Sequence, residues 1–241
     1  MLQNIKELYG HKLAAVDGEI GHVQDFYFDD KTWMIRYLVA DTGSWLAGRR
    51  VLLSPHAFGK LDQYENTLHV KLLKMQIQNS PSIELHKPVS RQYEEAYYRY
   101  YGWPAYWSDG TWGIGGYPVV MRPPQDLPAL PTRHRRADFR LQGTQAVTGY
   151  HIQTVDGTIG HVSGLMVDDK SWAVRELVVE TGHWYSGKEI LISPKKIEAI
   201  RHEELKVFVS LTKADIQQTG KHESAKARIE NYGTENFCTE S

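Results

Sequence analysis

The chain contains little cysteine, has no long apolar run, and carries charges that nearly cancel. Cys238 is the only cysteine in 241 residues, which excludes an intramolecular disulfide and a thiolate metal cluster. Lys and Arg number 28 against 29 Asp and Glu, so no overall attraction to nucleic acid or anionic lipid is expected. No uncharged run approaches the ~20 residues that span a bilayer, and the first residues lack a signal peptide's apolar stretch. We therefore expect a soluble, cytoplasmic protein.

The residue patterns of catalysis are also missing. Ser54 and Ser193 both precede prolines, and Cys238 stands in a polar tail, so none of the three is placed beside a base that would activate it. The glycines between 110 and 116 do not join a strand to a helix, as a phosphate-binding loop requires. The sequence therefore predicts no enzymatic activity, no catalytic residue and no bound cofactor or metal.

One stretch of the sequence is written twice. The segment Gly10–Pro55 recurs without a gap as Gly149–Pro194, and 22 of the 46 aligned residues are identical. A gapless duplication indicates a unit that folds as a piece, so two similar domains are predicted. The identical positions include turn glycines, aspartates and tryptophans, which we interpret as structural: Asp17, Gly18, Gly21, Trp33, Gly43 and Trp45 in the first copy, and Asp156, Gly157, Gly160, Trp172, Gly182 and Trp184 in the second.

Two other repeated features have a functional and a structural reading. His22 and His161 each follow the Asp-Gly turn, and an imidazole there would suit a metal ligand or an acid/base group. No second histidine or paired carboxylate stands at ligand spacing, so a strand hydrogen bond is favoured. The pairs Asp29-Asp30 and Asp168-Asp169 lack the glycine and distal glutamate of a calcium loop and are interpreted as turn residues.

The pattern within each copy is that of short strands. Asp17-Gly18 between apolar segments favours a hairpin, and the stretch 33–40 alternates aromatic and β-branched residues. Proline after Ser54 ends a strand, residues 68–72 form a further one, and 74–78 form a helical turn. Five or six strands per copy with little helix predict a mainly β protein with two small antiparallel barrels.

The segment between the copies has a different composition. Residues 90–106 contain many aromatic rings, and prolines crowd 118–131. Aromatic surface is costly to leave in water, so we expect the rings to pack on the barrels or on a partner, with 122–142 acting as a spacer. The candidate partner-binding residues are Tyr93, Tyr97, Tyr98, Tyr101, Trp103 and Tyr106.

One basic cluster follows the prolines. Arg133, Arg135 and Arg136 could contact RNA or anionic lipid with help from nearby rings. Basic linkers are common and Asp126 and Asp138 dilute the charge, so a nucleic-acid partner is disfavoured.

The signatures Asp-Gly-x-Ile-Gly-x-Val, Asp-Asp-Lys-x-Trp, Thr-Gly-x-Trp and Ser-Pro resemble the PRC-barrel domain, the small β-barrel shared by the photosynthetic reaction centre H subunit and the ribosome maturation factor RimM. The resemblance covers both copies, and the whole layout is similar to bacterial tandem PRC-barrel proteins. It implies a binding or assembly module and transfers no catalytic residue.

These observations predict two barrel repeats, at 1–80 and 143–220, an aromatic-, Gly- and Pro-rich connection at 81–142, and a disordered polar tail at 221–241. A protein-binding role is favoured, and a homo-oligomer is open. RNA or ribosome association, by analogy with RimM, is one alternative. A soluble accessory of photosynthetic or electron-transfer complexes, by analogy with the H subunit, is another.

Overall fold

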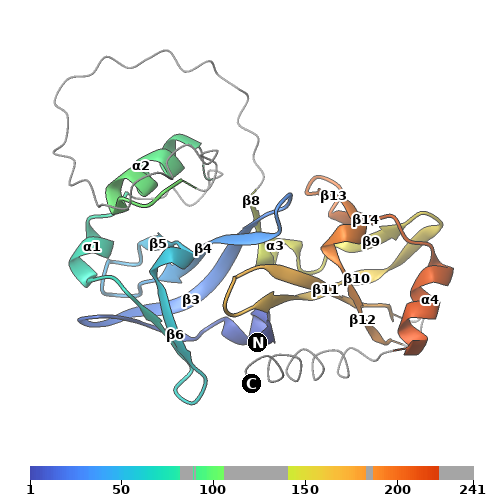
Figure 1. Ribbon diagram of the computed structural model, residues 1–241, viewed down its shortest axis with the longest axis horizontal. Coiled ribbons are helices and arrows are strands. Elements are labelled where there is room, and N and C mark those ends of the chain that lie inside the picture. Colours follow the sequence, from blue (N-terminus) through green and yellow to red (C-terminus); the bar gives the residue numbers. More distant parts are fainter. Residues whose placement is uncertain (82–88, 90, 106–140, 183–186, 223–241) are drawn as a thin grey trace, which may run out of the picture. The chain divides into compact units, whose positions relative to one another are not determined.

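The computed structural model describes residues 1–81, 89, 91–105, 141–182 and 187–222. The described residues fall into two units: those of 1–79 and 141–222 form the first, and those of 80–105 form the second. The first unit contains two seven-stranded sheets, one built mainly from each copy of the duplicated sequence (Figure 1). Within the described part of the chain the protein is therefore mainly β, as the sequence predicts.

The first sheet has the order β5-β4-β3-β2-β7-β6, with β8 added to β3. Its helical turns η1, η2 and α1 precede or follow these strands, and each matches a counterpart in the second copy. The bounds are β2 (Lys12–Ala15), β3 (Gly18–Asp29), β4 (Met34–Asp41), β5 (Arg50–Leu53), β6 (Phe58–Asp62), β7 (Thr67–Val70), η1 (Ile5–Leu8), η2 (Pro55–Ala57) and α1 (Lys74–Gln78).

The second sheet repeats the first with the order β12-β11-β10-β9-β14-β13 and with β1 added to β10. Equivalent strands are separated in the chain by the same number of residues as the two copies of the duplicated sequence. The bounds are β1 (Leu2–Asn4), β8 (Leu141–Gly143), α3 (Thr144–Val147), β9 (His151–Thr154), β10 (Gly157–Asp168), β11 (Val174–Glu180), β12 (Glu189–Ile192), η4 (Pro194–Lys196), β13 (Ile197–Arg201), β14 (Lys206–Val209) and α4 (Lys213–His222).

Each sheet mixes parallel and antiparallel pairs, which corrects the expectation of purely antiparallel sheets. The first strand of each copy lies parallel to the last, with Leu13 opposite Leu68 and Ile152 opposite Val207. Tight turns predict antiparallel neighbours only between consecutive strands, and they carry no signal for pairing between the ends of a repeat. Among the described residues no pairing joins β5 to β6 or β12 to β13, so each sheet is an open path of strands.

Each repeat pairs with the short strand that precedes the other repeat in the chain. β1 precedes the first repeat but pairs antiparallel with β10 of the second, where Asn4 lies opposite Met166. β8 precedes the second repeat but pairs with β3 of the first, where Gly143 lies opposite Tyr27. The two registers are equivalent under the duplication, so the exchange is reciprocal, and the repeats form one interlocked body.

A second set of contacts joins the repeats at the two equivalent tryptophans. The amide of Ile35 donates to the carbonyl oxygen of Trp172 at 2.9 Å, and that of Val174 donates to the carbonyl of Trp33 at 2.7 Å. Both tryptophans have a positive φ, 56° and 57°, which is rare for a bulky residue. In both repeats this backbone conformation presents the carbonyl oxygen of the tryptophan to the other repeat.

The tryptophan of the second repeat also packs into the first. The Trp172 ring stacks on Phe26 with 5.9 Å between centroids and meets the Phe58 ring edge-on at 4.7 Å. The side chain is buried. Trp33 is half-buried and stacks on Phe28 of its own repeat. The sequence prediction of a core or interdomain role for the repeated tryptophans is confirmed at Trp172.

The Asp-Gly signature does more than make a hairpin turn. The Asp17 carboxylate accepts a hydrogen bond from the amide of Lys74 at 2.8 Å, and Asp156 accepts one from the amide of Lys213 at 3.0 Å. Each aspartate thus satisfies an amide in the first turn of the helix that ends its repeat. Asp156 is exposed, and the slight desolvation that opposes its ionisation is outweighed by hydrogen bonds from the Thr154 hydroxyl and the Lys213 amide, which lower its pKa.

The second glycine of the signature is required by a close approach of two strands. A Cβ at Gly21 would lie 2.0 Å from the carbonyl oxygen of Asp41, and one at Gly160 would lie 2.0 Å from that of Glu180. Both glycines also have a positive φ. No other residue fits at either position without displacing the neighbouring strand.

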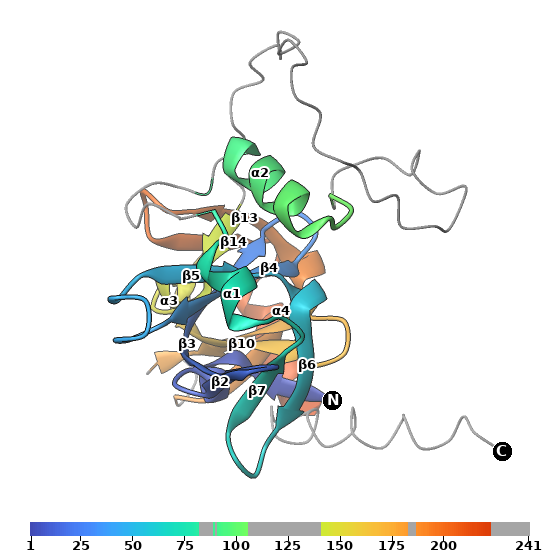
Figure 2. The same cartoon turned by 90° about the vertical axis from the view of Figure 1, so that its left-hand side faces the viewer.

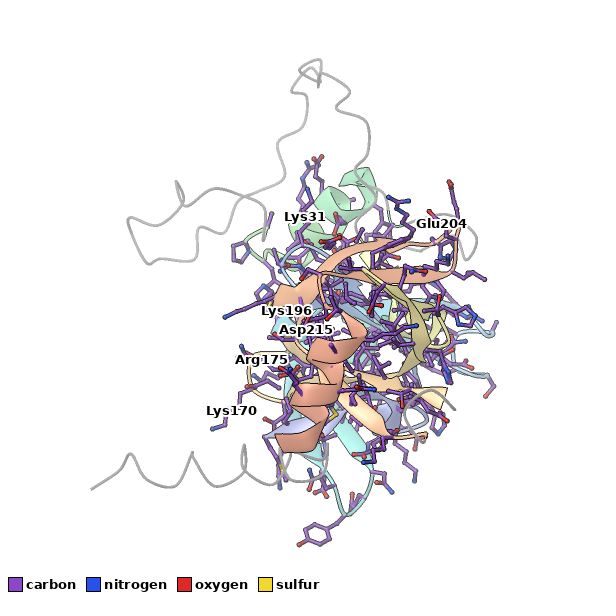
Figure 3. All side chains as sticks on the ribbon, turned by 90° about the vertical axis from the view of Figure 1, so that its right-hand side faces the viewer. Lys31, Lys170, Arg175, Lys196, Glu204 and Asp215 are labelled. Atoms are coloured by element: carbon purple, nitrogen blue, oxygen red, sulfur yellow. The ribbon has the colours of Figure 1, made fainter. Side chains whose placement is uncertain are left out.

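The aspartates of the Asp-Asp-Lys signature are turn residues, as predicted. Asp29 accepts the amides of Lys31 and Thr32, and Asp168 accepts those of Lys170 and Ser171. The repeated arginine completes the turn, since Arg36 lies 3.5 Å from Asp29 and Arg175 lies 3.7 Å from Asp168. Figure 3 labels Lys170 and Arg175 in the second repeat, and Lys31, the counterpart of Lys170.

Candidate interaction surface

Exposed apolar side chains gather around α1 of the first repeat. Val16 is 71% exposed, Leu73 40% and Met75 64%. The backbone brings them together, because the amide of Val16 donates to the carbonyl of Leu72 and the turn after Val16 is tied to Lys74 through Asp17. In Figure 2 the molecule is viewed from the end of the first repeat that carries α1. We call Val16, Leu73 and Met75 the α1 patch.

A cation and an indole ring border the α1 patch. The ammonium group of Lys74 lies 4.8 Å from the centre of the Trp45 ring, within the range of a cation–π interaction. The Arg49 guanidinium donates to the carbonyl oxygen of Gln78 at 2.9 Å, which fixes the loop that carries Trp45 against the end of α1. The repeated Trp45, predicted to be structural, thus lies half-buried beside the patch.

The second repeat keeps the geometry of this region and loses most of its apolar side chains. Val155 remains 73% exposed, but Thr212 stands where the first repeat has Leu73, and Ala214 stands where it has Met75. The strand order and the helical turn are the same in both copies, so these two substitutions change the exposed surface on an equivalent backbone. Exposed apolar residues that cluster in one copy alone are typical of a binding site.

The aromatic candidates of the connecting segment lie on and after helix α2 (Arg91–Tyr101), in the second unit. Tyr93, Tyr97 and Tyr101 follow a four-residue spacing along one face, with centroids 6.0 Å and 4.9 Å apart. The Trp103 ring stacks on Tyr101 at 4.5 Å. The rings therefore form one cluster along the helix.

Burial divides this cluster. Tyr97 and Tyr98 are buried, Tyr93, Tyr101 and Trp103 are half-buried, and Tyr100, which the sequence did not single out, is 42% exposed. Glu95 and Arg99 are exposed beside it. The sequence predicts that aromatic rings gather in this segment. Plotting the residues on a helical wheel would have been needed to place the exposed Tyr100 on a different face from the buried rings. Their contact with a partner stays a prediction.

Several predicted residues lie outside the described part of the chain. They are Tyr106 and Trp184 among the aromatic candidates, and Arg133, Arg135 and Arg136 of the basic cluster. The tail from 223 onward is also outside it, whereas 221 and 222 belong to α4.

The repeated histidines lie on equivalent strands opposite an acidic residue. His22 pairs with Asp41 in the strand register, and His161 pairs with Glu180. The His161 Nε2 atom is 3.6 Å from a Glu180 carboxylate oxygen, and both side chains are partly exposed. This separation is longer than a hydrogen bond, so the strand hydrogen bond predicted for the two histidines stays a prediction. In the described residues, no three His, Cys, Asp or Glu side chains converge as metal ligands would.

A polar cluster lies where α3 of the second repeat meets β3 of the first. The hydroxyl of Thr144 donates to the Asp25 carboxylate at 2.7 Å, and the phenol oxygen of Tyr9 lies 2.8 Å from the same hydroxyl. Burial raises the pKa of Tyr9 to about 12. Sequence reasoning missed this cluster because Thr144 is more than a hundred residues from both Tyr9 and Asp25.

The comparisons identify the fold of the first repeat. A family model described as the PRC-barrel domain matches residues 4–76. No curated protein matches the chain. Among the helices that the structure describes, none is both long and apolar enough to cross a membrane.

Proposed function

We propose that the chain is a non-enzymatic module of two PRC-barrel domains in tandem that binds a protein partner and holds it in an assembly. The proposal starts from the match of residues 4–76 to the PRC-barrel family model. Two findings support the tandem arrangement. The second repeat copies the signature residues without a gap, and its strands follow the same order as those of the first.

The observation that carries the protein-binding proposal is the α1 patch. Its three side chains are apolar and exposed, and they stand beside an indole ring held by a lysine. Burying apolar area is the main favourable term in protein association, and aromatic residues are enriched in interfaces. The backbone under this surface is held by hydrogen bonds of Val16 to Leu72 and of Asp17 to Lys74.

A protein partner explains this surface better than a nucleic acid does. One lysine, Lys74, borders the patch, and Asp17 accepts a hydrogen bond from its amide. Nucleic-acid affinity depends on several cations that neutralise phosphates. The basic cluster that could supply them lies outside the described residues, so no observation here favours the RNA alternative.

The duplication supplies a matched test. Leu73→Thr with Met75→Ala gives the first repeat the residues of the second, which the fold tolerates at equivalent positions. We expect this double variant to bind its partner about tenfold more weakly, since removing two exposed apolar side chains from an interface costs on the order of 1.4 kcal/mol. The loss of binding is measured by quantitative mass spectrometry, which compares the amount of each host protein captured by the tagged wild type and by the tagged variant.

The control is the reciprocal change, Thr212→Leu with Ala214→Met, which leaves the first repeat intact and should keep the same partner. The Leu73→Thr, Met75→Ala variant should unfold close to the denaturant concentration of the wild type, because both side chains are exposed. Thr212→Leu removes the hydrogen bonds between the Thr212 hydroxyl and Asp215 at the start of α4, so the control variant should lose about 1 kcal/mol of stability and still bind the partner. Equal recovery of every captured protein by wild type and by the Leu73→Thr, Met75→Ala variant contradicts the proposal.

A further inference from the structure

The α1 patch contains one side chain whose chemistry can be changed after folding. Met75 is 64% exposed, and the sulfur of an accessible methionine reacts with peroxides. The backbone around it is fixed, because the Met75 carbonyl oxygen accepts the Asn79 amide at 3.1 Å and the Asp17 carboxylate accepts the Lys74 amide. The side chain is therefore presented to solvent from an ordered helical turn.

The other methionines that the structure describes differ from Met75 in burial or in place. Met166 on β10 is 2% exposed and belongs to a core cluster of the second repeat. Met34, at the start of β4, is half-buried. Met1 is 59% exposed, but its carbonyl oxygen accepts the Asp169 amide, so it lies beside the second repeat and outside the patch. Among these side chains, Met75 alone is both exposed and part of the α1 patch.

The second repeat has no sulfur at the equivalent position, where Ala214 follows Lys213. In the first repeat, a leucine in place of Met75 would offer a partner a similar apolar area, because the two side chains have nearly the same volume. Hydrophobic contact alone therefore does not require a thioether here. What methionine adds is a flexible, polarisable group whose sulfur can be oxidised.

Oxidation would change what the patch offers to a partner. A hydroperoxide transfers one oxygen atom to the sulfur of Met75: an S–O bond forms, the O–O bond breaks, and the peroxide leaves as water or an alcohol. The sulfur loses two electrons and the peroxide gains them. The sulfoxide oxygen is a polar acceptor, and burying such a group in an apolar interface without a donor is unfavourable.

We propose that Met75 is a redox-controlled modification site, at which oxidation to the sulfoxide by a hydroperoxide weakens binding of the protein partner and reduction restores it. The inference rests on the proposed function, because it concerns the regulation of the same surface. A methionine sulfoxide reductase reverses the step: two thiols form a disulfide, and the sulfoxide oxygen leaves as water. The side chain is exposed, so its oxidation leaves the fold intact.

The reactivity of Met75 is tested on the full chain with hydrogen peroxide alone. Peptide mass spectrometry follows the sulfoxide at Met75 and at Met166 over time. We expect Met75 to be oxidised at least about tenfold faster, because the reaction follows the accessibility of the sulfur. Circular dichroism should stay unchanged while Met75 reacts. Equal rates at the two sulfurs would overturn the proposed site, whatever the partner is.

The effect on binding is measured on the host proteins that the wild type captures and the Leu73→Thr, Met75→Ala variant loses. We call these the patch-dependent proteins. The tagged chain is treated with hydrogen peroxide, and the peroxide is removed before the host extract is added. Capture should fall about tenfold, the cost of burying an unpaired polar group, and should return after treatment with sulfoxide reductases. Met75→Leu should capture the same proteins before and after peroxide.

A matched control moves the methionine to the other repeat. Met75→Leu with Ala214→Met keeps the number of methionines and should be oxidised in the second repeat without loss of capture. Unchanged capture by the oxidised wild type, or an equal loss by oxidised Met75→Leu, would overturn the redox control and leave the proposed function standing. An absence of patch-dependent proteins contradicts the proposed function itself, and the redox control with it.

Discussion

Trp172→Ala is expected to lower the free energy of unfolding by about 3–5 kcal/mol, the cost of emptying a buried aromatic site. The ring fills the space between Phe26 and Phe58, so its loss opens a cavity in the first repeat although the residue belongs to the second. Alanine keeps the strained φ of 57°, and the change therefore reports on the ring alone. Urea unfolding followed by circular dichroism measures the difference.

Trp33→Ala is the matched control, because this tryptophan has the same backbone conformation and a half-buried ring. Its ring stacks on one phenylalanine of its own repeat, so we expect a loss of about 1–2 kcal/mol. A larger loss for Trp33→Ala than for Trp172→Ala would show that Trp172 is not the ring that joins the repeats.

Gly21→Ala is expected to cost about 3 kcal/mol or more. The added Cβ would lie 2.0 Å from the Asp41 carbonyl oxygen, so β4 has to move away from β3, and the pairing of His22 with Asp41 is lost. The positive φ of Gly21 adds backbone strain. The midpoint of urea unfolding gives the cost, and Gly160→Ala should behave alike.

Gly43→Ala separates the close approach from the backbone strain. Gly43 also has a positive φ, 51°, but nothing lies within 4 Å of its Cβ position. The cost there should be about 1 kcal/mol, which is the strain of a left-handed backbone at a non-glycine residue. Equal losses for Gly21→Ala and Gly43→Ala would mean that the strands relax without cost, contrary to the geometry.

The sequence alone predicts most of the local structure of each repeat. The Asp17-Gly18 turn, the end of β5 at Ser54 and the helical turn at 74–78 all form where the residues favour them. These features depend on neighbours in the chain, and the duplication then carries them to the second repeat.

The sequence reasoning did not predict the strand exchange. Leu2-Gln3 recurs as Leu141-Gln142 at the same spacing as the rest of the duplication, so a signal for an extra element before each repeat was present. A three-residue strand can form the same hydrogen bonds with its own repeat as with the other repeat. The pattern of apolar residues in the sequence does not distinguish these two pairings. The family match begins at residue 4, inside β1, although β1 pairs with the second repeat.

The candidate site was only partly accessible from sequence. Counting rings located the tyrosine cluster, but burial of Tyr97 and Tyr98 depends on tertiary packing that composition does not encode. The α1 patch was missed because Leu73 and Met75 look like core residues in a short helical turn. Comparing the two copies position by position, Leu73 with Thr212 and Met75 with Ala214, is the signal that finds it.

The reciprocal exchange of strands β1 and β8 is the central structural claim, because it joins the two repeats into one body. The most direct measurement is a set of nuclear Overhauser contacts between strands in the isotope-labelled chain. The structure predicts contacts of residues 2–4 with 166–168 and of 141–143 with 27–29. Contacts of 2–4 with 27–29 and of 141–143 with 166–168 would show instead that each strand folds back on its own repeat, and would contradict the interlocked architecture.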